Sequence, residues 1–216
     1  GFYLMVWGFF KKLVIADNVG VIANKVFALS DPAFEMLWAG VFAFAIQIYA
    51  DFSAYTDIAR GSSRWLGFEL TQNFDHPYMA RNPADFWRRW NISLSTWFRD
   101  YLYIPLGGNR GSGLRVRVNL FVVFFLCGLW HGASWNFAIW GVFHGLMLVL
   151  ERGRLGRWSD AAPSLVSSAY TILIVMVGWV FFRAETLSGA ITYLKAMFYK
   201  GGGHGLSPQL AAALDP

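Results

Sequence analysis

The sequence predicts an all-α protein, a polytopic transmembrane helical bundle with re-entrant and interfacial helices, and three observations support this class. Only 14% of the 216 residues are charged, whereas a soluble domain has about 25%. Hydrophobic residues make up 56% of the chain and aromatic residues 19%, and tryptophan and tyrosine favour the membrane–water interface. Residues 118–150 contain no Asp, Glu, Lys or Arg, and this run exceeds the roughly 20 residues that cross a bilayer.

The first part of the chain alternates apolar segments with polar breaks. Residues 1–10 are apolar, and we expect a membrane helix here that ends at Lys11 and Lys12. Residues 13–29 mix apolar and polar side chains, which favours an interfacial or re-entrant helix. Residues 33–50 are largely apolar and are near the minimum length of a transmembrane helix.

The middle of the chain, residues 60–117, is the most polar section and contains nine arginines. By the positive-inside rule, this arginine excess predicts that the section lies on the cytoplasmic side. The section is also rich in aromatic residues, so we expect short helices that lie on the membrane or dip into it. The chain has no signal peptide features at its start, and we expect it to be an internal piece of a longer polytopic protein.

The last third of the chain begins with the uncharged residues 118–150, in which the small and polar run Gly132–Ser134 indicates a break. Two shorter helices and one long tilted helix both fit this pattern. We expect a polar loop at residues 156–163 and a further membrane span at residues 165–182. Residues 184–216 are predicted to form an amphipathic and flexible C-terminal segment.

Two histidines, His131 and His144, lie in the uncharged segment, where a charged imidazole is costly. Packing of a neutral ring and acid–base chemistry at membrane depth both explain such residues. On one continuous helix their spacing corresponds to roughly 220° of rotation, so they would face different sides unless the helix breaks. We expect no metal site, because no further Cys or His ligand lies nearby. We expect His76 and His204 on the surface and the single cysteine, Cys127, as a small buried residue.

Residues 86–110 (FWRRWNISLSTWFRDYLYIPLGGNR) combine cations with aromatic rings. Guanidinium groups bind phosphate, and tryptophan faces stack on flat rings. We therefore predict that this segment binds an anionic, nucleotide-bearing donor. The residues proposed for this binding are Arg88, Arg89, Arg99, Trp87 and Trp90. A basic interfacial segment with tryptophans at the headgroup level explains the same composition. Nucleic acid is not an expected partner, because the arginines flank apolar spans.

Residues 49–61 (YADFSAYTDIARG) carry two carboxylates, Asp51 and Asp57, directly after a predicted span. Two carboxylates suit general acid–base chemistry. The structural alternative is that Asp57 pairs with Arg60, which lies three residues later on the same helix.

Three segments together resemble the membrane-bound O-acyltransferase family. They are YADFSAYTDIARG, FWRRWNISLSTWFRDYLYIPLGGNR and LWHGASWNFAIWGVFHG, in this order. The resemblance is strongest to the bacterial branch that acetylates exopolysaccharides such as alginate, with the D-alanyl teichoic-acid transferases as relatives. It covers most of the chain and implies that residues 1–183 are the central to C-terminal part of the family's catalytic core.

The resemblance implies a multi-pass enzyme of the bacterial inner membrane. Such an enzyme moves an acetyl group from a cytoplasmic thioester, acetyl-CoA, towards a polysaccharide hydroxyl or a periplasmic acetyltransferase partner, with no bound cofactor or metal. The family's near-invariant histidine corresponds to His131, which acts as the general base. The second signature position corresponds to Asn91. Many relatives carry His there, so Asn91 implies a positioning role, and no catalytic role is implied for His144.

A different class of function remains open from the residues themselves. A polytopic transport or scaffold subunit would also carry histidines that line a path or pack helices. In that case no acyl donor binds, and Arg88 and Arg89 matter only for membrane topology.

Overall fold

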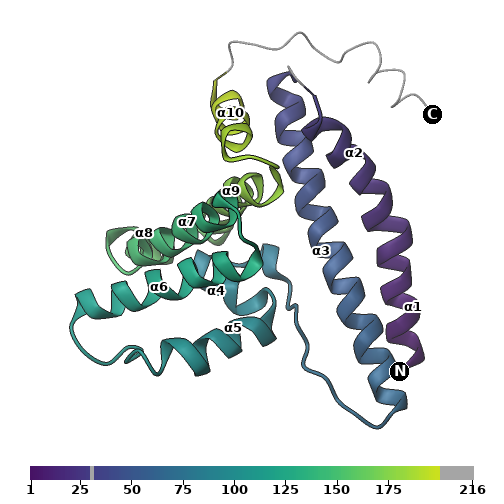
Figure 1. The fold of residues 1–216 in the computed structure, drawn as a ribbon, viewed down its shortest axis with the longest axis horizontal. Helices are drawn as coiled ribbons and strands as arrows, with labels where there is room; N and C mark the ends of the chain where they lie inside the picture. Colours follow the sequence, from purple (N-terminus) through teal and green to yellow (C-terminus); the bar gives the residue numbers. More distant parts are fainter. Residues whose placement is uncertain (30–31, 200–216) are drawn as a thin grey trace. The chain divides into compact units, whose positions relative to one another are not determined.

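The computed structural model describes residues 1–29 and 32–199. These residues form helices joined by turns, with an isolated β-bridge between Phe74 and Trp90, so the predicted all-α class is confirmed (Figure 1). The chain divides into two compact units, each described here by itself. One consists of Gly1–Leu66 together with the chain from Arg183 onward, and the other is Gly67–Phe182.

The helices of the first unit are α1 (Phe2–Phe10), α2 (Asp17–Phe27), α3 (Phe34–Trp65) and α10 (Leu187–Phe198), with a π-helical segment over Lys11–Ala16. The α-helices of the second unit are α4 (Pro83–Arg89), α5 (Ile92–Phe98), α6 (Gly113–His131), α7 (Trp135–Glu151), α8 (Arg154–Ala161) and α9 (Ser164–Arg183), whose last residue belongs to the first unit. The second unit also contains a 3₁₀ turn over Pro77–Met79 and a π-helical segment over Arg99–Tyr103.

Within the described residues, three helices are long and apolar enough to cross a membrane by length and composition: α3, α6 and α9. Helix α7 is apolar but shorter. Part of the predicted C-terminal segment, Leu187–Phe198, forms helix α10. It packs on α2 and α3, where the Tyr193 hydroxyl donates to the Leu37 carbonyl at 2.8 Å and its ring stacks on Phe27. Residues 200–216 of the predicted C-terminal segment, including His204, lie outside the described residues.

The first helical segment is longer than the sequence predicted. The expected helix end at Lys11 and Lys12 is wrong, because α1, the π-helical segment and α2 run without interruption from Phe2 to Phe27. The separate interfacial or re-entrant helix expected over residues 13–29 is the second half of this segment. Helix α3 lies beside it along its length (Figure 1).

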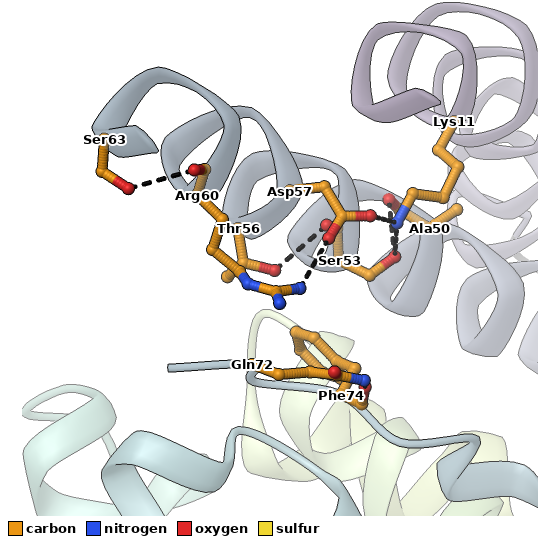
Figure 2. Close-up of polar contacts among 9 residues, drawn as sticks. All are labelled: Lys11, Ala50, Ser53, Thr56, Asp57, Arg60, Ser63, Gln72 and Phe74. Carbon is orange, nitrogen blue, oxygen red and sulfur yellow. Dashed lines mark hydrogen bonds and ion pairs between the residues drawn. The ribbon is translucent and has the colours of Figure 1, made fainter. Parts of the chain in front are cut away.

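Ion pairs with α3 explain why two lysines do not end this helix. Lys11 Nζ lies 2.8 Å from Asp57 Oδ2 and donates to Ser53 Oγ at 2.9 Å (Figure 2). Lys12 Nζ lies 3.0 Å from Asp51 Oδ1. A cation that is paired and hydrogen-bonded can remain inside a packed helix pair, because its partners offset the cost of desolvation.

The second unit confirms one prediction and corrects another. The chain breaks after His131, so residues 118–150 form parts of two helices, α6 and α7, rather than one. The polar loop expected at residues 156–163 is wrong, because most of it belongs to α8. Its polar side chains bond locally: Ser159 Oγ donates to Glu151 Oε2 at 3.2 Å, and Ser167 Oγ donates to the Ser159 carbonyl at 2.6 Å.

Candidate functional site

A close crossing of α6 and α7 positions the two histidines. A Cβ on Gly141 would lie 3.1 Å from the Cα of Gly128 and would collide with the carbonyl oxygen of Phe124. The two backbones approach so closely because neither glycine has a side chain, as is common between membrane helices. His131 and His144 each lie three residues after one of these glycines, so the crossing brings both histidines to the same region.

His131 is the last residue of α6, at the break before α7. Its imidazole is half-buried. The ring centroid lies 5.2 Å from that of Trp140 and 5.2 Å from that of Phe182, both edge-to-face. The ring is therefore held among aromatic faces from α7 and α9 while part of it stays accessible.

His144 lies on α7 and is 1% exposed. Its ring centroid lies 5.0 Å from Trp140 and 4.9 Å from Trp87, which belongs to α4. On its other side, Gly178 of α9 leaves room for the imidazole, because a Cβ there would collide with His144 Nε2. Three helices thus enclose this histidine.

Trp140 contacts both histidines. They were expected to face different sides only on one continuous helix, and the break after His131 lets both pack against one indole ring. We call this group the histidine–aromatic cluster. Its members are Trp87, His131, Trp140, His144 and Phe182.

Three hydrogen-bonding atoms in the histidine–aromatic cluster are buried without a partner among the described residues. They are Trp87 Nε1, Trp140 Nε1 and His144 Nδ1. A buried polar atom that loses its water and gains no partner costs about 1–3 kcal/mol, and such atoms are rare in native proteins. Three of them within one set of touching rings mark the histidine–aromatic cluster as the candidate functional site.

Asn91 lies at the start of α5 with a left-handed backbone (φ 44°), a conformation that asparagine tolerates better than most residues. The residue is buried, and its side chain makes no hydrogen bond to another described residue. No direct contact joins it to His131. The ring of its neighbour Trp90 packs on Trp179, which packs on Phe182, which in turn contacts His131.

The proposed donor-binding arginines differ in their surroundings. Arg89 Nε donates to Asp85 Oδ1 at 3.0 Å, and this bond raises the pKa of the Arg89 guanidinium. Arg99 Nε donates to Asp100 Oδ1 at 2.7 Å, and the bond lowers the pKa of the Asp100 carboxyl. Arg88 is exposed and has no ion pair within the described part of the chain. Arg88 is therefore the member of this set whose charge is not already matched.

The two predicted stacking residues have separate environments. Trp87 belongs to the histidine–aromatic cluster. Trp90 is 5% exposed and packs edge-to-face on Phe74 and in parallel on Phe86. The structure therefore places Trp87 beside His144 and Trp90 in the core of the second unit.

The carboxylates of residues 49–61 lie on α3, in the first unit. Asp57 is held between Lys11 and Arg60, whose Nη1 lies 3.5 Å from Asp57 Oδ1 (Figure 2). The structural alternative for Asp57 is therefore confirmed. Asp51 pairs with Lys12.

The remaining histidine and cysteine predictions concern single residues. His76 is exposed, as expected, and its Nδ1 lies 3.0 Å from Asp75 Oδ1. Cys127 is a free, half-buried thiol on α6. Within residues 1–29 and 32–199, no group of three or more His, Cys, Asp or Glu side chains is arranged to hold a metal ion.

Sequence reasoning missed Trp140 and Gly178, and it left His144 without a role. A signal for the first was present, because GLWHG (128–132) and GVFHG (141–145) share one pattern. In both, a glycine precedes the histidine by three residues, which places the two on one face of a helix. No comparable local signal marks Gly178, because its contact with His144 joins segments far apart in the sequence.

Comparison with known proteins gives a family match. A model described as "MBOAT, membrane-bound O-acyltransferase family" matches residues 3–184. The chain is 49% identical over 198 residues to the "Probable alginate O-acetylase AlgI" of Azotobacter vinelandii, covering 90% of this chain and 39% of that protein. It is 41% identical over 201 residues to the "Peptidoglycan O-acetyltransferase" of Helicobacter pylori, covering 91% of this chain and 38% of the relative.

A more distant relative extends this group. The "Teichoic acid D-alanyltransferase" of Bacillus subtilis is 27% identical over 191 residues, covering 82% of this chain and 47% of that protein. The chain thus spans about two fifths of the length of the alginate and peptidoglycan relatives.

Proposed function

Because the chain belongs to the membrane-bound O-acyltransferase family, we propose that it supplies the general base, His131, of a membrane O-acetyltransferase. The enzyme moves an acetyl group from a thioester donor, acetyl-CoA, to a polysaccharide hydroxyl or to a periplasmic partner that passes it on. We place this activity in the bacterial inner membrane. Relatives named as alginate and peptidoglycan O-acetylating enzymes support the acetyl group and the polysaccharide acceptor.

The observation that carries this proposal is the set of unpartnered atoms in the histidine–aromatic cluster. Trp87 Nε1, Trp140 Nε1 and His144 Nδ1 are buried and unbonded, and the Trp140 ring contacts His131. A bound carbonyl or hydroxyl would accept from an indole N–H and so remove the cost of its burial. A purely structural role in helix packing gives no reason to keep three such atoms around one tryptophan.

The proposed step balances in atoms and charge. A neutral His131 imidazole takes the proton of the acceptor hydroxyl while that oxygen attacks the thioester carbonyl carbon. The carbonyl oxygen carries negative charge in the intermediate, and hydrogen-bond donors stabilise it. The carbon–oxygen bond of the new ester remains and the carbon–sulfur bond breaks. The thiolate that leaves accepts the proton from His131.

In this proposal, other residues bind the donor and orient the bound groups. Asn91 has a buried side chain with an unused amide, which suits it to orient a bound group. Arg88 is exposed and unpaired among the described residues, and we assign it to a phosphate of the donor. Arg89 and Arg99 would have to exchange Asp85 and Asp100 for such a phosphate. Trp87 contributes the ring that faces His144, whereas Trp90 supports the core.

The test compares transfer from radiolabelled acetyl-CoA in isolated membranes for wild type, His131→Asn and His76→Asn at matched expression. We expect His131→Asn to lose at least about 100-fold in rate while binding of coenzyme A persists. His76 is an exposed histidine, so its substitution controls for a general effect of losing an imidazole. Transfer by His131→Asn at the wild-type rate would show that His131 is not the base. Absence of coenzyme A binding in wild type would instead favour the transport or scaffold function.

A further inference from the structure

The second unit contains a groove away from the histidine–aromatic cluster. It has a volume of about 550 Å³, within the range of small-ligand sites. The groove lies where α6 begins, α7 ends and α8 starts. Its lining residues are Arg117, Val149, Leu150, Gly153, Arg154, Leu155 and Trp158. None of these residues has a role in the acyl transfer proposed above.

The charge of the groove is positive and unmatched. Arg117 and Arg154 are exposed, and within the described ranges neither makes a hydrogen bond or an ion pair through its guanidinium. The nearest carboxylate along the chain, Glu151, is already engaged. Its two oxygens accept from Ser159 at 3.2 Å and from Tyr170 at 2.8 Å. Two free guanidinium groups beside one groove fit a phosphate, which accepts several hydrogen bonds at once.

The rest of the groove is apolar. Val149 and Leu150 come from the last turn of α7, and Leu155 and Trp158 come from α8. Leu150 is 51% exposed and Trp158 is 46% exposed, so these side chains lack cover from the described chain. A ligand that combines an anionic phosphate with hydrocarbon fits both sets of side chains.

The position of the groove at the start of a candidate membrane span agrees with this chemistry. Helix α6 is a candidate membrane span that begins at Gly113, and Arg117 lies about 6 Å along it. At this depth an arginine keeps its stem in the apolar layer and its guanidinium at the headgroups. Trp158 suits the same level. Basic pockets at the ends of membrane helices bind anionic lipid headgroups.

We propose that this groove binds one anionic phospholipid. The lipid phosphate pairs with Arg117 and Arg154, and its acyl chain lies along Val149, Leu150 and Leu155. Binding would join the start of α6 to α8 and so hold the cytoplasmic ends of these helices at the membrane surface.

The experiment is native mass spectrometry of the detergent-solubilised protein after incubation with phosphatidylglycerol. We compare wild type with the double variant Arg117→Gln/Arg154→Gln and with Arg157→Gln. Arg157 is exposed on the same short helix α8 but does not line the groove, so it controls for loss of surface charge. We expect the double variant to bind phosphatidylglycerol about 30-fold more weakly and Arg157→Gln to bind as wild type does.

Two further arms identify the source of the phosphate. Zwitterionic phosphatidylcholine tests for the net charge, and soluble glycerol phosphate tests for the headgroup without hydrocarbon. Weak binding of both supports an anionic lipid. Displacement of phosphatidylglycerol by millimolar glycerol phosphate would overturn the lipid proposal in favour of a site for soluble phosphate esters. Equal lipid binding by wild type and the double variant would overturn the site itself.

Discussion

At the scale of single residues, the position of His144 depends on Gly178, because this glycine has no side chain that would occupy the same space. Gly178 on α9 faces the imidazole so closely that a methyl group would collide with Nε2. His144 in turn contacts Trp140, which contacts His131. A substitution at Gly178 is therefore expected to affect the proposed base, His131, indirectly, through the rings of His144 and Trp140.

The first prediction concerns this contact. Gly178→Ala should destabilise the protein by about 1–3 kcal/mol, because an added methyl group in a filled core forces its neighbours to move. Thermal unfolding in detergent measures the effect, and acetyl transfer should fall with it. Gly113→Ala is the control, since a Cβ there meets nothing within 4 Å. Equal stability of Gly178→Ala and wild type would mean that His144 is not packed against α9.

Single residues also show how much of the candidate site can be predicted from the sequence. The sequence marks His131 as a candidate site residue, because a histidine in an uncharged run is unusual and the surrounding motif is specific. The cluster around it was not predictable. Trp87 and Gly178 reach His144 from helices 57 and 34 residues away in the sequence, and local patterns do not report which helices meet.

At the scale of elements, the uninterrupted segment from Phe2 to Phe27 shows that a lysine with an ion-pair partner need not mark the end of a membrane helix. Two adjacent lysines in an apolar context normally mark a membrane boundary. Here the lysines have partners on α3, and the helix passes through them as a π-helical segment. Lys11 and Asp57 are separated by 46 residues, so a sequence window around the lysines contains no sign of the pair.

Lys11 and Lys12 are predicted to contribute different amounts to the stability of the protein. The Lys11 and Asp57 side chains are 13% and 17% exposed, whereas those of Lys12 and Asp51 are 42% and 49% exposed. Lys11→Met should destabilise the protein by about 2 kcal/mol, because it leaves a half-buried carboxylate and a buried hydroxyl with fewer partners. Lys12→Met should cost less than about 1 kcal/mol, as expected of an exposed pair. Unfolding of both variants in the same detergent checks the difference, and a larger loss for Lys12→Met would contradict it.

The break between α6 and α7, unlike the Lys11–Asp57 pair, can be predicted from the local sequence. Gly132 is unfavourable in a helix interior and Ser134 favours a helix N-cap, and the structure ends α6 just before this run. The close crossing at Gly128 and Gly141 follows from the absence of side chains at two positions. The repeated GLWHG and GVFHG pattern indicates a glycine at the same position before each histidine. It predicts the close crossing only if the two helices are known to be neighbours.

At the scale of the whole molecule, composition was enough to predict the class. A low share of charged residues and long apolar runs require helices in a membrane, because only helices satisfy their backbone hydrogen bonds within one segment. Composition does not predict that the chain divides into two units, with residues 67–182 holding the entire histidine–aromatic cluster. That division arises from contacts between distant segments.

Acetyl transfer by the whole protein, as proposed, requires His131 to act as a base rather than as a packed ring. The measurement that tests it is acetyl transfer by His131→Ala in membranes, with and without added imidazole. We predict that imidazole restores the rate at least about tenfold, because it supplies the missing proton acceptor in the space left by the side chain. Pyrazole, which has the same shape but is a much weaker base, should not restore it. Equal recovery with both compounds, or no recovery with imidazole, would contradict the assignment of His131 as the base.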